Sequence, residues 1–290
     1  MPSDRASRNQ IAVIVPFSGE RAEADRLLAD LRAIDRGPRD ELIVVDNSPQ
    51  PVIASQPDVT IVRADEIASS YHARNAGARA AGADWLVFTD ADCRPAPGLL
   101  GAYRDALGDS QTSFIAGEVK PAAKQSSLIA RWHRSRGHLS ATSQLELGPY
   151  PSAGTANLLV SRALWLELDG FSEVVSGADF EFCWRAGRAG WTLSYTPTAR
   201  VEHIHPEKLA EVLRNARRYG AGQRWANTRF PGARPAPAIV RQISRAIAGT
   251  LVWAVSLRFE RAAFKAIDGV ALAGYAWGYH FGSNQAQPLA

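Results

Sequence analysis

Two aspartates, Asp90 and Asp92, directly follow the apolar run 84–89 and are separated by a single alanine. The run is short and rich in branched and aromatic residues, which predicts a buried strand rather than a helix. Because residues i and i+2 of an extended chain point the same way, both carboxylates can serve one site. Two hard oxygen donors suit Mg²⁺ or Mn²⁺, which keeps open positions for substrate phosphates. The alternative is an ordinary surface turn, where Asp is common.

The elements that must position these aspartates alternate between strand and helix. Apolar runs predict strands at 11–15, 42–45 and 59–62, and helical spacing of apolar residues predicts helices at 21–34 and 70–81. This alternation predicts an α/β fold with a mostly parallel sheet covered by helices. Ligands bind outside the carboxyl ends of the strands in such sheets. Those ends carry Pro16 to Glu20, Asp46, and then Asp90 and Asp92.

Six short motifs occur in one order along roughly residues 10 to 225. They are VIVP at 13–16, VVDNS at 44–48, ARNAG at 73–77, TDAD at 89–92, GFSE at 170–173 and GADFEFCWR at 177–185. Together they resemble the motifs of the GT-A-fold glycosyltransferases of family 2, which move a sugar from a nucleotide-diphosphate donor with inversion of the anomeric carbon. The chain departs from that pattern at Ala178, where the family often has Glu, although the following Asp179 is present.

The resemblance implies a GT-A fold, Rossmann-like, with a mostly parallel sheet flanked by helices and a C-terminal helical extension. We expect a flexible N-terminus at residues 1–9, a catalytic domain at 10–230 and a helical, membrane-interfacial segment at 231–290. The Pro/Gly-rich stretch 231–237 reads as the linker between the last two. A chain of 290 residues is long enough to bury a full core.

The resemblance also implies roles around a nucleotide-sugar donor. Asp92 would ligate Mn²⁺ or Mg²⁺, while Asp90 would contact the ribose or a metal-bound water. Asp46 would bind the nucleoside, and Pro16 and Glu20 would line the same pocket.

Basic residues complete the expected donor site. Arg74 would brace Asp90 or the phosphates, with an ordinary surface arginine as the alternative. His203 would be a third metal ligand near the diphosphate, and it is preferred to His205 for this role. The alternative is that both histidines are structural, as such pairs often are. Arg218 would contact a phosphate.

The general base is expected on the segment 177–189, which reads as a helix ended by a glycine. Residues i and i+2 of a helix diverge by about 200°, so Asp179 and Glu181 do not converge on one hydroxyl. Asp179 lies in the first turn, where an acid can face a cleft, and is the expected base. A simple favourable interaction with the helix N-terminus is its alternative role. Glu181 would face solvent or pair with Arg185.

Charge is uneven along the chain. The stretch 206–265 holds 12 basic and three acidic residues, and uncharged runs at 246–257 and 269–279 include several aromatic residues. Such asymmetry indicates an anionic partner, and the apolar runs favour a membrane surface with anionic lipid over nucleic acid. The alternative is a helical hairpin that packs on the catalytic domain or on a second subunit.

Several functional classes compete at this point. The leading hypothesis is a glycosyltransferase of polysaccharide biosynthesis, cytoplasmic and peripheral on the inner face of the membrane, that acts on a glycan or lipid-linked acceptor. A nucleotidyltransferase is disfavoured because residues 16–20 are not a glycine-rich, basic loop. A non-catalytic subunit of the same fold remains open because of Ala178. Two cysteines exclude a disulfide framework, and no apolar run approaches the length of a membrane span.

Overall fold

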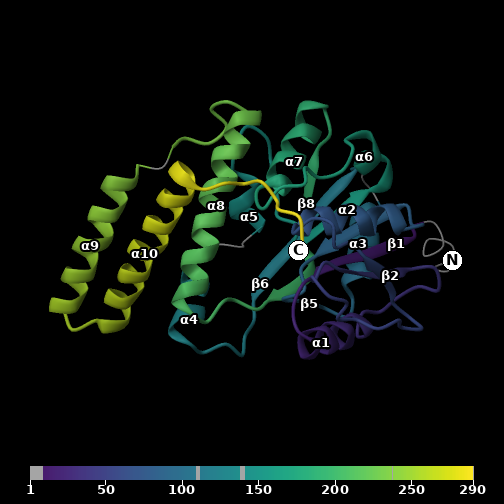
Figure 1. Cartoon of the computed structure of the whole chain (residues 1–290), viewed down its shortest axis with the longest axis horizontal. Coiled ribbons are helices and arrows are strands. Elements are labelled where there is room, and N and C mark those ends of the chain that lie inside the picture. The colour runs from purple at the N-terminus through teal and green to yellow at the C-terminus, as the bar shows by residue number, and fades with distance from the viewer. Residues whose placement is uncertain (1–8, 109–111, 138–140, 237, 290) are drawn as a thin grey trace. The chain divides into compact units, whose positions relative to one another are not determined.

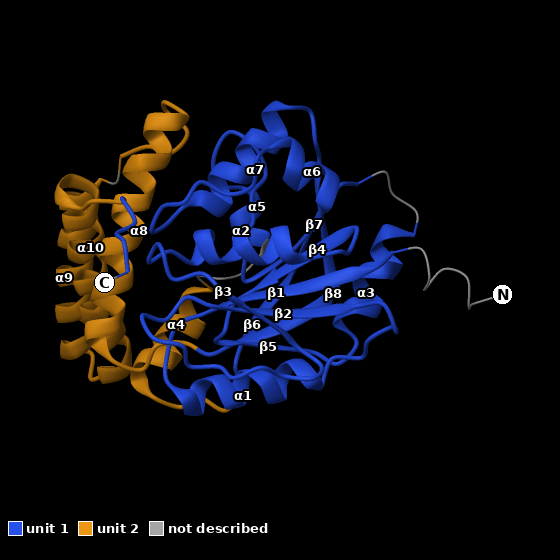
Figure 2. Cartoon of the chain, turned by 45° about the vertical axis from the view of Figure 1, so that its right-hand side comes forward, with its two compact units in different colours: residues 1–122, 139–204, 285–290 blue, residues 123–138, 205–284 orange. Residues whose placement is uncertain are grey.

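A computed structural model describes residues 9–108, 112–137, 141–236 and 238–289. The chain divides into two compact units (Figure 2). The first consists of residues 1–122, 139–204 and 285–290, and the second consists of residues 123–138 and 205–284. Most of the N-terminal segment 1–9, which we expect to be flexible, lies outside the described residues.

The first unit is built on an eight-stranded sheet with the order β3-β2-β1-β4-β7-β6-β8-β5. Its strands are β1 Ile11–Phe17, β2 Glu41–Asp46, β3 Thr60–Arg63, β4 Trp85–Thr89, β5 Cys93–Pro95, β6 Phe114–Pro121, β7 Asn157–Ser161 and β8 Leu193–His203. The first four strands in this order pair in parallel, as do β6 and β8. β7 runs antiparallel to both β4 and β6, and β5 runs antiparallel to β8. The α/β fold is therefore confirmed, with a sheet that is parallel from β3 to β4 and mixed beyond β4.

Helices cover both faces of this sheet (Figure 2). They are α1 Arg21–Arg32, α2 Ser70–Ala80, α3 Leu99–Leu107, α5 Ala141–Leu145, α6 Arg162–Glu167 and α7 Ala178–Arg188. α1 and α3 bury leucines against Val13 and Val15 of β1. α2 lies on the opposite face, where a Cβ on Gly77 would collide with the side chains of Ile14 and Val45. Successive side chains of a strand point to opposite faces, so β1 supplies both layers of the core.

The chain returns to the first unit at its end. Pro288 and Gln285 form β-bridges with Ile67 and Val174. The backbone N–H of Ala68 donates to the carbonyl of Gln287 at 2.8 Å. The C-terminal peptide therefore ties the segment before α2 to the segment before α7.

The second unit is helical and consists of α4 Leu128–Arg136, α8 Leu209–Arg229, α9 Ile239–Val255 and α10 Phe259–Phe281. α10 lies between α8 and α9 (Figure 1). A Cβ on Gly220 or Gly278 would collide with the backbone of the facing helix, so α8 and α10 approach closely. Asp268 of α10 accepts hydrogen bonds from Trp132 Nε1 at 2.9 Å and Arg136 Nη2 at 2.7 Å. The predicted boundary at residue 230 falls inside this unit, between α8 and α9.

None of the helices that the structure describes combines the length and the hydropathy needed to cross a bilayer. α10 is instead a packing element, since its glycines and Asp268 face α8 and α4. α10 thus packs on α8 and α4 within the second unit, whereas α9 keeps one apolar face exposed; membrane association of this segment stays a prediction.

Candidate active site

The two aspartates of the sequence analysis meet a histidine from a distant strand. Asp90 directly follows β4, and the antiparallel pairing of β5 with β8 sets Cys93 opposite His203. The N–H of Ile204 donates to the carbonyl of Asp92 at 2.8 Å, which fixes the end of β8 beside the turn. His203 Nε2 lies 3.3 Å from Asp92 Oδ1.

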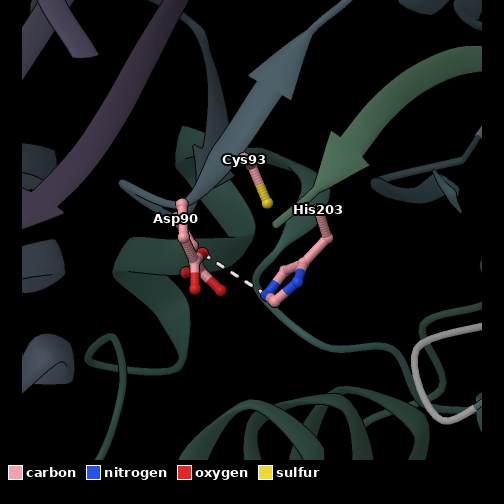
Figure 3. A group of neighbouring side chains, drawn as sticks. Asp90, Cys93 and His203 are labelled. Atoms are coloured by element: carbon pink, nitrogen blue, oxygen red, sulfur yellow. Dashed lines mark ion pairs between the residues drawn. The ribbon is translucent and has the colours of Figure 1, made fainter. Parts of the chain in front are cut away.

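Potential ligand atoms of Asp90, Asp92, Cys93 and His203 all lie within 4.8 Å of one another. Figure 3 shows Asp90, Cys93 and His203 reaching toward a common space. The carboxylates fit Mn²⁺ or Mg²⁺, and the imidazole fits Mn²⁺ better than Mg²⁺, which prefers oxygen ligands. Cys93 fits less well, because a thiolate is a soft ligand that these cations do not prefer; burial and the neighbouring charges of Asp92 and Asp90 also raise the pKa of its thiol well above the ordinary value. Asp90, Asp92 and His203 are therefore the candidate ligands; the sequence analysis expects Asp90 at the ribose or a metal-bound water, and metal binding by this group stays a prediction.

Arg74 of α2 holds the first of these carboxylates in place. Its side chain is 5% exposed, and its Nη2 donates to Asp90 Oδ1. The guanidinium also lies over the Tyr71 ring, 5.2 Å from the centroid. The expectation that Arg74 braces Asp90 is confirmed, and the alternative of an ordinary surface arginine is wrong. The reason is that the small residues of α2 bring this helix close to the sheet.

Asp179 lies in the first turn of α7, next to the Arg74 and Asp90 pair. Gly177 is the N-cap of α7, and its φ of 87° lies in the left-handed region that favours glycine. The N–H of Gly177 donates to the Tyr71 hydroxyl at 3.2 Å, and the N–H of Phe180 donates to Asp179 Oδ1 at 2.9 Å.

The electrostatics of Asp179 distinguish it from an ordinary surface acid. Burial raises the pKa of its carboxyl, and the charge of Asp90 adds to the rise. Hydrogen bonds from Phe180 N–H and the Tyr71 hydroxyl, together with the charge of Arg74, oppose this shift without cancelling it. A carboxyl with a raised pKa accepts a proton more readily, as a general base requires.

Glu181 has a different environment from Asp179. It is 1% exposed and accepts hydrogen bonds from Arg185 Nε at 2.9 Å and Ser172 Oγ at 3.2 Å. Pairing with Arg185 is confirmed, and the solvent-facing alternative is wrong. Glu181 is therefore a structural carboxylate that joins α7 to the segment before it.

The predicted nucleoside pocket lies at the carboxyl ends of β1 and β2. Phe17 pairs with Asp46, which brings the segment from Pro16 to Glu20 beside the end of β2. Asp46 is 1% exposed and accepts hydrogen bonds from Val52 N–H at 2.7 Å and Ser48 N–H at 3.0 Å. Burial alone would raise the pKa of Asp46, but these hydrogen bonds outweigh it and the pKa lies below the ordinary value.

Asp46 thus shapes the loop after β2, and Glu20 begins α1 in a capping box with Glu23. Asn47, which the sequence analysis did not single out, joins two loops through its amide, which donates to the Ile67 carbonyl at 2.8 Å. Nucleoside binding by Pro16, Glu20 and Asp46 stays a prediction.

Two other predicted residues belong to the second unit. Arg218 is exposed on α8, with its guanidinium 5.4 Å from the Tyr219 ring centroid, and its phosphate contact stays a prediction. His205 stacks on His133 at 4.9 Å between ring centroids, and its backbone N–H donates to Gln125 Oε1 at 2.7 Å. His205 is therefore structural, which agrees with the choice of His203 as the candidate ligand.

The sequence profile described as "Glycosyltransferase like family 2" matches residues 8–222. The chain belongs to this family. The family 2 match contains every predicted site residue, from Pro16 to Arg218, and ends within α8.

Similar proteins agree with this assignment. The chain is 25% identical over 255 residues to the "Pre-mycofactocin glycosyltransferase" of Mycobacterium tuberculosis, a match that covers 82% of this chain and 52% of that protein. The chain thus spans about half the length of this relative. It is also 26% identical over 225 residues to "Glycosyltransferase AglE" of Haloferax volcanii, covering 73% of this chain and 72% of that one.

Solved structures share the fold. The mannosyltransferase PcManGT from Pyrobaculum calidifontis, solved with GDP-Man and Mn²⁺, matches with a TM-score of 0.65 and 19% identity over 94% of this family 2 chain and 89% of that one. Residues 1–349 of TarS from S. aureus match with a TM-score of 0.50 and 14% identity, covering 93% and 90% of the two chains. At these identities the likeness concerns the GT-A fold alone.

Proposed function

We propose that the chain is an inverting glycosyltransferase that moves a sugar from a nucleotide-diphosphate donor to a hydroxyl of a glycan or a lipid-linked acceptor. One observation carries the proposal. Arg74 donates a hydrogen bond to Asp90, which belongs to the group formed with Asp92 and His203. The charge of Arg74 also acts on Asp179. A cation-binding group and a carboxylate of raised pKa are thus neighbours, as sugar transfer requires.

The donor side of the reaction needs positive charge near the leaving diphosphate. Asp90, Asp92 and His203 would hold Mn²⁺ or Mg²⁺, which when bound offsets the charge that develops as the sugar–phosphate bond breaks. Arg74 fixes Asp90, so this carboxylate keeps its position when a donor enters. Asp92 is the most exposed member, at 53% of its side chain, and leaves the group open toward solvent. The Mn²⁺ and GDP-Man in the PcManGT structure support this assignment.

The acceptor side needs a base. Asp179 would accept the proton of the acceptor hydroxyl, because burial raises the pKa of its carboxyl and thereby its proton affinity. Tyr71 holds both Asp179 and the N-terminus of α7 through its hydroxyl. Ala178 is fully buried at the first position of α7, so this position serves packing in the present chain.

Other functional classes fit less well. Membership of glycosyltransferase family 2 supports transfer of a glycosyl group over transfer of a nucleotidyl group. A non-catalytic subunit would not need Asp90, Asp92 and His203 grouped together with Arg74 linking Asp90 to Asp179. A lipid-linked acceptor would lie at a membrane, so peripheral association with the inner face of the membrane and a role in polysaccharide biosynthesis belong to the same proposal.

A screen of nucleotide-sugars tests the function directly. A ligand that binds only the folded state raises its stability by about 2.7 kcal/mol at 100 times its dissociation constant. We therefore expect one nucleotide-sugar to raise the Tm in the presence of Mn²⁺ or Mg²⁺ and to do so weakly with excess chelator. GDP-Man is the first donor to try. If no nucleotide-sugar raises the Tm with either ion, the donor assignment is wrong.

A further inference from the structure

α9 presents large apolar side chains on one exposed face. Val240, Ile247, Leu251 and Val255 are between 57% and 84% exposed and follow helical spacing along the whole helix. Leu257 and Phe259 continue this surface around the turn into α10, at 75% and 66% exposed. We call these six residues the α9 outer face.

The opposite side of α9 packs against α10. Ala246 is 4% exposed, and its Cβ would lie 3.7 Å from a Cβ placed on Gly269 of α10. Gly249 likewise faces the side chain of Lys265. Since α10 covers this opposite side, packing within the second unit does not account for the apolar character of the outer face.

Arginines lie at both ends of the α9 outer face, where the one acidic neighbour along the described chain is Glu260, which pairs with Arg131. α9 contains no acidic residue, and Arg241 and Arg245 are exposed on its first two turns. At the other end, Arg258 and Arg261 lie over the ring of Trp253, 5.4 and 4.9 Å from its centroid. Apolar side chains bordered by arginines and a tryptophan are typical of helices that lie in the headgroup region of a bilayer.

We propose that the α9 outer face docks on a membrane surface that contains anionic lipid. Charge decides between this occupant and a second copy of the chain. A two-fold dimer through the same face would bring two sets of arginines together, and such like charges repel. This docking surface deepens the proposed function, because a lipid-linked acceptor would lie at the same membrane. It rests on the proposed function for that acceptor. Binding to lipid itself does not depend on catalysis.

The test is flotation of the full chain with vesicles of phosphatidylcholine alone or mixed with phosphatidylglycerol. We expect binding to the mixed vesicles that weakens as salt is added. The double variant Ile247→Gln/Leu251→Gln should bind at least about tenfold more weakly, because it removes two large apolar groups from the interface. Arg241→Gln/Arg245→Gln should bind roughly 25-fold more weakly at low salt, at about fivefold per arginine.

A matched control separates the surface from a general effect of polarity. Leu166 of α6 is 58% exposed, close to the 63% of Leu251, but lies outside the α9 outer face. Leu166→Gln should float like the parent chain. All these positions are exposed, so the variants should keep the Tm and the stabilisation by nucleotide-sugar of the parent.

Three results would overturn the proposal: no binding to the mixed vesicles at low salt, equal loss of binding in Leu166→Gln, or a dimer in solution that Ile247→Gln/Leu251→Gln dissociates. The last would assign the face to a second copy. Failure of the nucleotide-sugar screen with intact vesicle binding would instead reject the proposed function and leave the docking surface standing.

Discussion

Replacing Asp179 with Asn should separate catalysis from stability. Asn has nearly the same shape and keeps an acceptor for the N–H of Phe180, so the turn that begins α7 should persist. It cannot take up a proton, and loss of a general base costs about 10²- to 10⁴-fold in turnover, or roughly 3 to 5 kcal/mol of barrier. Donor affinity should hardly change, because the lost group acts on the acceptor.

The stability of the same variant should move in the opposite direction. Burial raises the pKa of Asp179, so the folded state disfavours its charged form more than the unfolded state does. The charged carboxylate therefore destabilises the fold at neutral pH, and Asp179→Asn should leave the Tm unchanged or raise it. This difference should shrink as the pH falls through the raised pKa, because the parent carboxyl is then neutral. Thermal unfolding at several pH values, beside steady-state transfer assays, measures both effects.

Glu181→Gln is the matched control on the same helix. It leaves the side chain of Arg185, which is 19% exposed, without its charged partner, and breaking such a pair is costly. We expect a lower Tm with turnover within about tenfold of the parent. If Glu181→Gln abolishes turnover in a folded protein while Asp179→Asn keeps it, the assignment of the base is refuted.

Three further predictions concern neighbouring groups. Asp92→Asn should remove the Tm increase that nucleotide-sugar and Mn²⁺ produce together, while the Tm of the ligand-free protein stays the same. If nucleotide-sugar and Mn²⁺ stabilise the variant as much as the parent, Asp92 is not a ligand. Tyr71→Phe removes a hydrogen bond that lowers the pKa of Asp179, so the acidic limb of the pH profile of kcat/KM should shift to higher pH. If Tyr71 has a purely structural role, the variant should instead have a lower Tm and an unchanged pH profile. His72 lies 2.9 Å from each of two glutamate carboxylates, and their hydrogen bonds outweigh burial and raise its pKa above 6.5. The contribution of His72 to stability should be complete below about pH 6.5 and lost as the pH rises through the raised pKa. The Tm difference between the parent and His72→Gln should therefore be largest at acidic pH. A Tm difference that does not depend on pH would contradict this.

Local patterns in the sequence determine much of the candidate site. The apolar runs locate β1, β2, β3 and β4 to within about two residues, because alternation and length identify a buried strand. The position of Asp90 and Asp92 after β4 follows from chain order alone. The choice of His203 over His205 as a metal ligand stays a prediction, although His203 lies 3.3 Å from Asp92 and His205 stacks on His133.

Residues that depend on long-range contacts could not be predicted in the same way. The sequence allowed Glu181 to face solvent or to pair with Arg185, yet Glu181 and the neighbouring Phe182 are both buried. The reason is that α7 is covered on more than one side, and a polar residue is tolerated there only because Arg185 and Ser172 satisfy it.

The sequence by itself determined the strands, the order of the motifs and the family, because each depends on residues that are neighbours along the chain. Tertiary structure decided the antiparallel joins of the sheet, the burial of Arg74 against Asp90, and the placing of Tyr71 beside Asp179. It also decided that α10 packs inside the second unit while α9 keeps an apolar face exposed. These features depend on contacts between segments tens of residues apart, and the free energy of such contacts comes from burial and hydrogen bonds that form only when the chain is folded.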